Sequence, residues 1–306
     1  MNISKVIIPA AGLGSRFLPY TKAVPKEMIP LLNKPAIQYV VEESVQSGIK
    51  NIIIVNNRER LSIHHYFSAA PELTALLKEQ HKEELITSVE KLLRMATFTY
   101  ISQAEPLGLG HAVLMASHMV DPREHVAVIL PDDLIFHAQP AIEQLIKIAT
   151  EERGTVIAVQ EIPHECCSSY GIVAVKKQLT PRLYQVASLI EKPITCDAPS
   201  NIAIVGRYVL SAKIFPILKE LSDDNTREIQ LTDAISELIR AGEKVYAYKI
   251  QGNRFDIGTP IGWLKATIAL ALHHPEYGPQ IQEFLTASDL FDSFQLNPIK
   301  NILHKA

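Results

Sequence analysis

The chain has 306 residues, a net charge of -3 at pH 7 and an apolar content of 47%. This length suits one large α/β domain or two small ones, and the apolar content supplies a sizeable core. The mild negative charge excludes bulk attraction to DNA, RNA or anionic lipid, so a binding site for phosphate must be a local feature.

Cysteine usage and the N-terminus bear on the compartment. Cys166, Cys167 and Cys196 do not form a disulfide framework, because their number is odd and two are adjacent. We interpret them as free thiols in a reducing compartment. The N-terminal residues lack the organisation of a signal peptide, and no apolar run of about 18 residues could form a transmembrane helix. We therefore expect a cytoplasmic protein without a membrane or nucleic-acid partner.

Short β-branched runs alternate with longer amphipathic stretches in the first half of the chain. They predict strands at 6–9, 51–57, 97–103 and 125–133, and helices at 35–48 and 111–120. The segment 58–94 is long, charged and helical in its apolar period; it suits a lid, an oligomer surface or a solvated face. The alternation of strand and helix favours a mainly parallel sheet with helices on both faces.

The second half of the chain is less regular. Its apolar runs predict strands at 154–162, 170–175, 183–193, 201–210 and 245–250, and helices at 211–221, 229–241 and 261–274. Residues 275–306 are polar and show no clear core pattern. Because no internal repeat or low-complexity linker divides the chain, we predict one domain with a helical C-terminal extension.

The most informative cluster is PAAGLGSRFLPYTKAVPKEMIP at 9–30, directly after the first predicted strand. Gly12 and Gly14 permit a turn with exposed backbone N–H groups, and a following helix would add the positive end of its dipole. Arg16 and Lys26 add fixed positive charge that has no packing role in such a turn. The combination predicts a polyphosphate site, and hence an enzyme or binder of a nucleoside triphosphate.

Two common phosphate-binding motifs do not fit this turn. A dinucleotide fingerprint needs a third glycine where Phe17 stands, and an acidic residue where Asn56 and Asn57 end the second predicted strand. The P-loop pattern is absent from the chain. A purely structural turn would leave Arg16 and Lys26 unexplained.

The stretch AAGLGSRFLPYTKAVPKEMIPLLNKP resembles the signature of the sugar nucleotidyltransferases, and within that family it is similar to the bacterial UTP–glucose-1-phosphate uridylyltransferases. Further matching motifs follow in order along the chain: QAEPLGLGHAV (103–113), LPDD (130–133), SSYGIV (168–173), IEKP (190–193), VGRYVL (205–210), EIQLTDAI (228–235) and RFDIGTPIGWLKA (254–266). Three positions depart from the family pattern: Ser15 replaces the usual Thr, Asn33 replaces a common Asp, and DIGTP replaces Asp-x-Gly-Ser-Lys.

The resemblance implies a Rossmann-like (GT-A-like) α/β fold with a mixed, mainly parallel sheet. It divides residues 1–270 into a nucleotide-binding half at about 1–135 and a sugar-binding half at about 136–270, followed by a helical extension at 271–306. It also implies attack of glucose 1-phosphate on the α-phosphorus of UTP, giving UDP-glucose and pyrophosphate, in a homodimer or homotetramer. The attacking phosphate is already ionised at neutral pH, so positioning and fixed positive charge should carry the catalysis.

Arg16 and Lys26 are expected to bind the triphosphate, Arg16 through its planar fork and Lys26 as a point charge. Gln103 offers both a donor and an acceptor to the uracil imide edge, although a Gln that merely ends a strand is the alternative. The adjoining Gly108 allows close backbone approach to a base and favours base reading. The resemblance implies the following nucleotide-binding set: Ala11, Gly12, Gly14, Arg16, Lys26, Gln103 and Gly108.

Asp132 and Asp133 end the strand predicted at 125–133, and ligands of open α/β sheets bind at that edge. Hard carboxylate oxygens suit Mg²⁺, which keeps water ligands and takes others from substrate phosphates. We predict that Asp132 binds Mg²⁺, with Asp256 as a second ligand and Asp133 in a supporting or solvent-facing role. A helix N-cap pair is the alternative for the two adjacent aspartates.

Glu191 and Lys192 are adjacent, so on a strand their side chains would point to opposite faces, whereas on a loop both could reach one ligand. Without the resemblance they would be an ordinary exposed turn. The resemblance implies that Glu191 binds sugar hydroxyls, that Lys192 binds the sugar phosphate and that the backbone of Gly171 passes close to the sugar. Arg16, Lys26 and Lys192 are the predicted catalytic residues.

Two other functions remain open at this point. Thymidylyl or another nucleotidyl transfer to a hexose 1-phosphate keeps the chemistry and changes the nucleotide. A non-catalytic sensor of nucleotide sugars would require loss of the metal carboxylate or of the sugar-phosphate lysine. Because Asp132 and Lys192 are both present, the chain favours an enzyme.

Overall fold

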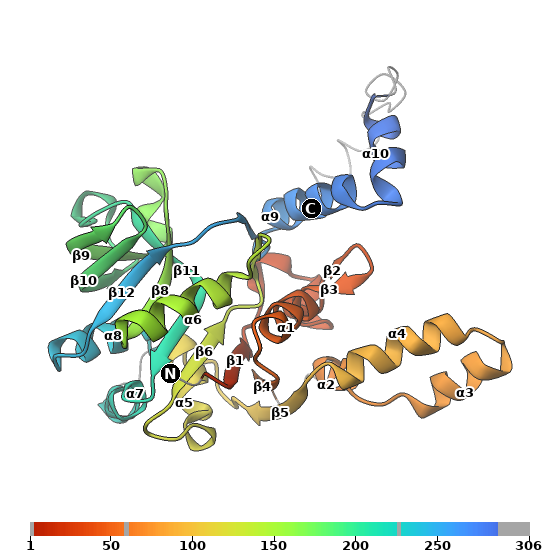
Figure 1. The fold of residues 1–306 in the computed structure, drawn as a ribbon, viewed down its shortest axis with the longest axis horizontal. Helices are drawn as coiled ribbons and strands as arrows, with labels where there is room; N and C mark the ends of the chain where they lie inside the picture. Colours follow the sequence, from red (N-terminus) through yellow and green to blue (C-terminus); the bar gives the residue numbers. More distant parts are fainter. Residues whose placement is uncertain (1–2, 58–60, 225–227, 287–306) are drawn as a thin grey trace.

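A nine-stranded sheet forms the centre of the molecule and carries helices on both faces (Figure 1). The structure is a computed structural model that describes residues 3–57, 61–224 and 228–286. The strands of the main sheet are β1 (Lys5–Ala10), β4 (Asn51–Asn56), β5 (Thr97–Ser102), β6 (His125–Ile129), β8 (Thr155–Glu161), β9 (Gly171–Thr180), β10 (Leu183–Glu191), β11 (Ile202–Ser211) and β12 (Val245–Lys249). Their order across the sheet is β5-β4-β1-β6-β11-β8-β12-β10-β9.

The sheet is parallel at one end and mostly antiparallel at the other. β5, β4, β1 and β6 are parallel neighbours, and β12 pairs with β8 in the same sense. The pairs β6–β11, β11–β8, β12–β10 and β10–β9 are antiparallel. The predicted mixed α/β fold is confirmed. The expectation of a mainly parallel sheet holds only for the part of the sheet formed by β5, β4, β1 and β6. The C-terminal ends of the four parallel strands meet at one edge, where the site residues begin.

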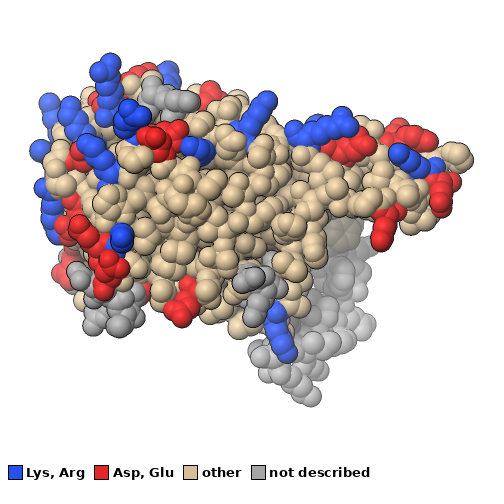
Figure 2. Space-filling model, turned by 90° about the horizontal axis from the view of Figure 1, so that it is seen from below, with Lys and Arg blue, Asp and Glu red and all other residues tan. Residues whose placement is uncertain are grey.

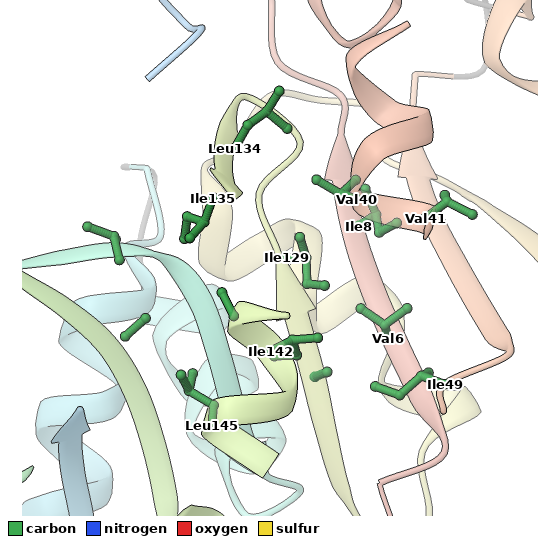
Figure 3. Close-up of a cluster of buried hydrophobic side chains, with 14 of the residues drawn as sticks. Val6, Ile8, Val40, Val41, Ile49, Ile129, Leu134, Ile135, Ile142 and Leu145 are labelled. Carbon is green, nitrogen blue, oxygen red and sulfur yellow. The ribbon is translucent and has the colours of Figure 1, made fainter. Parts of the chain in front are cut away.

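Two layers of helix cover the sheet. One face carries α1 (Ala36–Gln46), α2 (Ser62–Tyr66), α6 (Ala141–Glu152) and α9 (Pro260–His273), and the other carries α5 (Leu109–Met115), α7 (Ile214–Asp224) and α8 (Leu231–Arg240). In β1, Ile8 lies beside Val40 of α1 and Val6 lies near Ile49 (Figure 3), while Ile7 belongs to the opposite core. Burial on both faces explains why these strands read as continuous apolar runs.

Two helical segments project from the body of the molecule (Figure 1). The first, in the segment predicted to be helical, comprises α3 (Pro71–Glu79) and α4 (Glu83–Arg94), along which side chains of both charge signs are interspersed (Figure 2). The second is α10 (Tyr277–Thr286), which packs on α9. The rest of the predicted extension, 287–306, lies outside the described residues. Within the described ranges, no helix is long and apolar enough to cross a bilayer.

The structure corrects two local expectations. The strand predicted at 125–133 ends at Ile129, and a turn leads into β7 (Asp133–Phe136), which pairs with β13 (Asn253–Asp256) in a separate ribbon. No α-helix directly follows the glycine turn, because closely spaced prolines remove the N–H donors that a helix needs. Short 3-10 turns and a small hairpin take its place: Ser15–Phe17, Tyr20–Lys22 and Lys26–Met28, then β2 (Pro30–Leu31) and β3 (Lys34–Pro35).

Candidate active site

A cavity of about 420 Å³ opens at the edge where β1, β5 and β6 end. Most of the predicted nucleotide-binding residues line it: Ala11, Gly12, Gly14, Lys26, Gln103 and Gly108. Arg16 lies beside it in the exposed turn Ser15–Phe17. The structure therefore brings residues from two separate parts of the chain, 11–26 and 103–108, to one cavity.

A second cavity, of about 190 Å³, lies next to the first. Its lining includes Gly171, Glu191 and Asp256, which the sequence assigns to the sugar and the metal. Asp132 lines both cavities, as do Leu109 and Leu130. The predicted nucleotide and sugar sites thus meet at the predicted metal ligand.

The glycine turn holds the ammonium of Lys26 against its backbone. Gly14 adopts φ 67°, a conformation that favours glycine, and its carbonyl oxygen accepts a hydrogen bond of 2.8 Å from the hydroxyl of Thr21. A Cβ atom placed on Gly12 would lie 3.5 Å from Cε and 3.7 Å from Nζ of Lys26. The small residue at position 12 therefore leaves the cation close to the open cavity.

Lys26 forms an ion pair with Asp132, with Nζ 2.5 Å from Oδ2. Burial favours the neutral form of both groups, but their mutual attraction outweighs it. The pKa of Lys26 is consequently raised and the pKa of Asp132 is lowered, so both stay charged at neutral pH. The cation and the carboxylate are both held where the two cavities meet.

Gln103 is almost fully buried, at 4% exposed, and its amide is fixed by neighbours. Its Nε2 donates to the carbonyl of Gly108 at 3.2 Å and lies 2.9 Å from Nδ1 of His111. Burial lowers the pKa of His111, which keeps this ring neutral and able to accept. Gly108 has φ 97°, and a Cβ there would lie 2.7 Å from the carbonyl oxygen of Ile229. The backbone at Ile229 passes so close to position 108 that a side chain there would clash, which explains the glycine.

The carboxylates of Asp132 and Asp256 converge on Gly258. A Cβ on Gly258 would lie 3.1 Å from Oδ1 of Asp256, 3.2 Å from Oδ2 of Asp132 and 3.7 Å from Nη1 of Arg16. The backbone N–H of Ile257 donates to the carbonyl of Asp132 at 2.9 Å, which ties the two segments together. Two acidic groups and one cation therefore lie close around Gly258, and a larger residue there would have to displace the carboxylates by a few tenths of an ångström.

This donor set fits Mg²⁺ held partly by substrate. Among the described residues, no group of three or more His, Cys, Asp or Glu side chains could hold a metal ion by itself. Mg²⁺ commonly uses one or two carboxylates and completes its shell with water and phosphate oxygens. Asp132 and Asp256 are compatible with that pattern.

Asp133 is buried, at 5% exposed, and does not face solvent. Its Oδ2 accepts from the N–H of Gly206 at 2.9 Å, and its Oδ1 accepts from Nε of Arg254 at 2.7 Å. Burial acts against the charge of Arg254, but the Asp133 carboxylate outweighs this and raises the Arg254 pKa. Both oxygens of Asp133 are therefore occupied by protein groups.

The turn after β10 places Glu191 and Lys192 on the same side. Lys192 adopts φ 43°, which bends the chain out of the strand pleat, and its Nζ lies 3.4 Å from Oε1 of Glu191. The backbone N–H of Lys192 donates to the carbonyl of Tyr170 at 3.0 Å, and the hydroxyl of Thr232 donates to Oε2 of Glu191 at 2.9 Å. A Cβ on Gly171 would lie 3.1 Å from that same oxygen of Glu191. The glycine therefore lets the backbone at position 171 lie close to the Glu191 carboxylate.

Sequence reasoning missed several residues that line the site or hold it. Arg254 stands two positions before Asp256 in RFDIG, and Thr232 lies within EIQLTDAI. Both residues therefore belong to motifs that the sequence analysis recognised, but neither was given a role there. Tyr170 and Glu228 also line the cavities. Their proximity to the predicted residues depends on chain crossings that a linear reading does not show.

Residues 5–271 match the nucleotidyl transferase family. The chain belongs to this family. It is 44% identical over 284 residues to the UTP–glucose-1-phosphate uridylyltransferase YngB of Bacillus subtilis, covering 93% of this chain and 95% of that protein. Among solved structures, it is similar to a UTP-bound UGPase from Acinetobacter baumannii, with 37% identity, a TM-score of 0.86, and coverage of 94% of this chain and 100% of the other.

A UDP-glucose pyrophosphorylase complexed with UDP-glucose is also similar to this nucleotidyl transferase. The two chains are 36% identical with a TM-score of 0.78, and the match covers 88% of this chain and 98% of the other. The matched region includes every predicted site residue, because these lie between Ala11 and Asp256, inside the family match.

Proposed function

We propose that this nucleotidyl transferase forms UDP-glucose and pyrophosphate from UTP and glucose 1-phosphate. The observation that carries the proposal is the meeting of the two cavities at Asp132, with Lys26 lining the one and Gly171 and Glu191 lining the other. The uridylyltransferase of Bacillus subtilis at 44% identity, and the similar structures bound to UTP and to UDP-glucose, support this substrate pair.

In the proposed reaction, the phosphate of glucose 1-phosphate attacks the α-phosphorus of UTP in line, and pyrophosphate leaves. The nucleophile is ionised at neutral pH, so the protein need not remove a proton. Arg16 and Lys26 hold the triphosphate and counter the charge that develops on the leaving group. Lys192 holds the attacking phosphate, and Glu191 accepts hydrogen bonds from sugar hydroxyls. Gln103 contacts uracil.

Mg²⁺ is proposed as the cofactor, with Asp132 and Asp256 as its protein ligands. When bound, it would neutralise phosphate charge and help to orient the reacting groups. Lys26, which is paired with Asp132 in this structure, would be free to bind a phosphate oxygen once another cation shares that carboxylate. The protein's own part is to keep cations on both sides of two anions that otherwise repel each other.

We also propose a cytoplasmic homodimer or homotetramer. Two free thiols, Cys166 and Cys167, support a reducing compartment. A Rossmann-like description is proposed for the parallel half, because β1, β4, β5 and β6 lie side by side with helices on both faces. Size-exclusion chromatography with light scattering measures the oligomeric state directly.

The test is a pyrophosphate-release assay on the purified full chain. UTP, dTTP, ATP and GTP are each combined with glucose 1-phosphate or galactose 1-phosphate, with Mg²⁺ or with EDTA. We expect the highest kcat/KM for UTP with glucose 1-phosphate, and loss of turnover in EDTA. Preference for dTTP would replace the proposal with thymidylyl transfer, and binding of UDP-glucose without any turnover would indicate a sensor.

A further inference from the structure

Arg254 contacts Asp133 on one side and Tyr170 on the other. None of the roles proposed above involves this arginine. It is on β13, whose ribbon partner β7 begins at Asp133. In this ribbon Asp133 is directly opposite Asp256, so the two carboxylates share one face. Like charges placed directly opposite each other in a ribbon are destabilising.

Arg254 is two residues before Asp256 on the same strand, and therefore on the same face as both carboxylates. Its Nε donates to Oδ1 of Asp133 at 2.7 Å, and both side chains are nearly buried, at 12% and 7% exposed. With the N–H of Gly206 on the other oxygen, this pair holds Asp133 in one orientation. Asp256 is then left to face Asp132.

The other end of Arg254 reaches the sugar side. Its guanidinium lies over the ring of Tyr170, 5.3 Å from the centroid, and Nη1 is 3.5 Å from the Tyr170 hydroxyl. The carbonyl of Tyr170 accepts from the backbone N–H of Lys192 at 3.0 Å. One side chain therefore contacts both the residue next to Asp132 and the residue that anchors the Lys192 turn.

We propose that Arg254 is a positioning residue that fixes the carboxylate pair relative to the Lys192 turn, by pairing with Asp133 and by its cation–π contact with Tyr170. It acts through these neighbours, and the proposal rests on the proposed function above. Arg254 lines the smaller, sugar-side cavity and not the nucleotide cavity. Its loss should consequently affect the reacting phosphates and the sugar more than the recognition of UTP.

The test compares Arg254→Met, Arg254→Lys, Asp133→Asn and the double variant Asp133→Asn/Arg254→Met with the unmodified full chain. For Arg254→Met we expect kcat to fall by about 10- to 100-fold, the range for residues that orient ligand-binding groups, with KM for UTP changed by less than about twofold. UDP-glucose affinity, measured by calorimetry, should weaken in the same variant. Arg254→Lys should recover part of both losses.

The double variant decides whether the two residues act as one unit. If they do, it should be no more than about twofold worse than the poorer single variant, because partners in one interaction are not additive. Arg254→Met alone leaves the Asp133 charge buried without a partner, and this variant could fail to fold for that reason. The double variant removes both charges, so it still tests the proposal in that case. Arg182→Met is the matched control, because Arg182 contacts the carbonyl of Lys249 far along the sheet.

Three results would overturn the proposal. The first is an Arg254→Met protein with normal kcat and normal UDP-glucose affinity. The second is a double variant whose loss equals the product of the two single losses. The third is a lower unfolding temperature with unchanged kinetics per folded molecule, which would make Arg254 only structural. Inactivity of the unmodified chain, by contrast, would reject the proposed function, and UDP-glucose affinity would still test Arg254.

Discussion

The Nζ atom of Lys26 lies 2.5 Å from Oδ2 of Asp132, so the cation from the glycine turn and the carboxylate after β6 are partners. This pair joins two segments that are distant in the sequence, and it sits where the two cavities meet. Each member is also a candidate for binding substrate or metal. The pair therefore links the folding of the site to its chemistry.

Replacement of Lys26 by Met should lower kcat by about 10²- to 10³-fold, the scale of losing one preorganised group that stabilises transition-state charge. Pyrophosphate release under saturating substrates measures this. Lys78→Met on the exposed face of α3 is the control and should leave kcat unchanged. A Lys26→Met protein that turns over normally would remove this lysine from the triphosphate site.

The Lys26–Asp132 pair should contribute to stability across a defined pH window. Because the folded pKa of Asp132 is lowered, its contribution is present above the unfolded value of about 3.9 and is lost as pH falls through the folded pKa. Because the folded pKa of Lys26 is raised, its contribution is present below about 10.4 and is lost as pH rises through the folded pKa.

Urea unfolding of the unmodified protein and of Asp132→Asn between pH 3 and 11 checks this window. The difference in unfolding free energy should be constant between about pH 5 and 10 and should shrink at both ends. A difference that changes steadily through neutral pH would mean that another group controls it.

Lys192→Ala should abolish most turnover with little effect on folding, because its side chain is 58% exposed and its backbone already adopts the bent conformation. We expect KM for glucose 1-phosphate to rise while KM for UTP stays close to normal. Lys192→Arg keeps the charge and should retain more activity. Full activity in a correctly folded Lys192→Ala protein would exclude this residue from the sugar-phosphate site.

Gly258→Ala should raise the Mg²⁺ concentration needed for half-maximal activity by several-fold. The added Cβ would lie 3.1 and 3.2 Å from oxygens of Asp256 and Asp132, which is tighter than ordinary packing allows. Gly48→Ala is a useful control, because a Cβ there meets nothing within 4 Å, although its φ of 85° disfavours alanine. An unchanged Mg²⁺ requirement in Gly258→Ala would place the metal elsewhere.

The buried pair Arg207–Glu43 predicts a large effect on stability. Arg207 is 0% exposed, and its guanidinium donates to both oxygens of Glu43, at 2.9 and 2.7 Å. Arg207→Leu should cost about 3–5 kcal/mol of unfolding free energy, because it leaves a buried charge without its partner. The double variant Glu43→Leu/Arg207→Leu should lose less in the same urea titration, and equal losses would contradict this explanation.

The parallel half of the fold could be predicted because each strand is a short apolar run and each connecting helix has helical spacing. The expected strands at 51–57 and 97–103 correspond closely to β4 and β5. Helix α6 was not predicted, although Ile142, Leu145 and Ala149 recur at helical intervals and are buried. The ribbon of β7 and β13 could not be foreseen, since it joins segments more than 100 residues apart.

The candidate site shows the same division. Local motifs predicted roles for Gly12, Lys26, Gln103 and the acidic residues, and the structure brings these residues to the two cavities. The partnership of Arg254 with Asp133 was missed, since it depends on the ribbon register. The sequence allows either a strand or a loop at Lys192, and the φ of 43° shows that the chain bends out of the strand there. The sequence therefore indicates which side chains can take part in the site, and the pairing of distant strands decides which of these side chains are in contact.

A crystal structure of the full chain with UDP-glucose would show directly whether one molecule spans the two cavities. We expect uracil to lie beside Gln103, the diphosphate to pass Asp132 and glucose to contact Glu191. Product bound outside the two cavities, or within them with its uracil and glucose ends reversed, would rule out the proposed assignment of the two cavities.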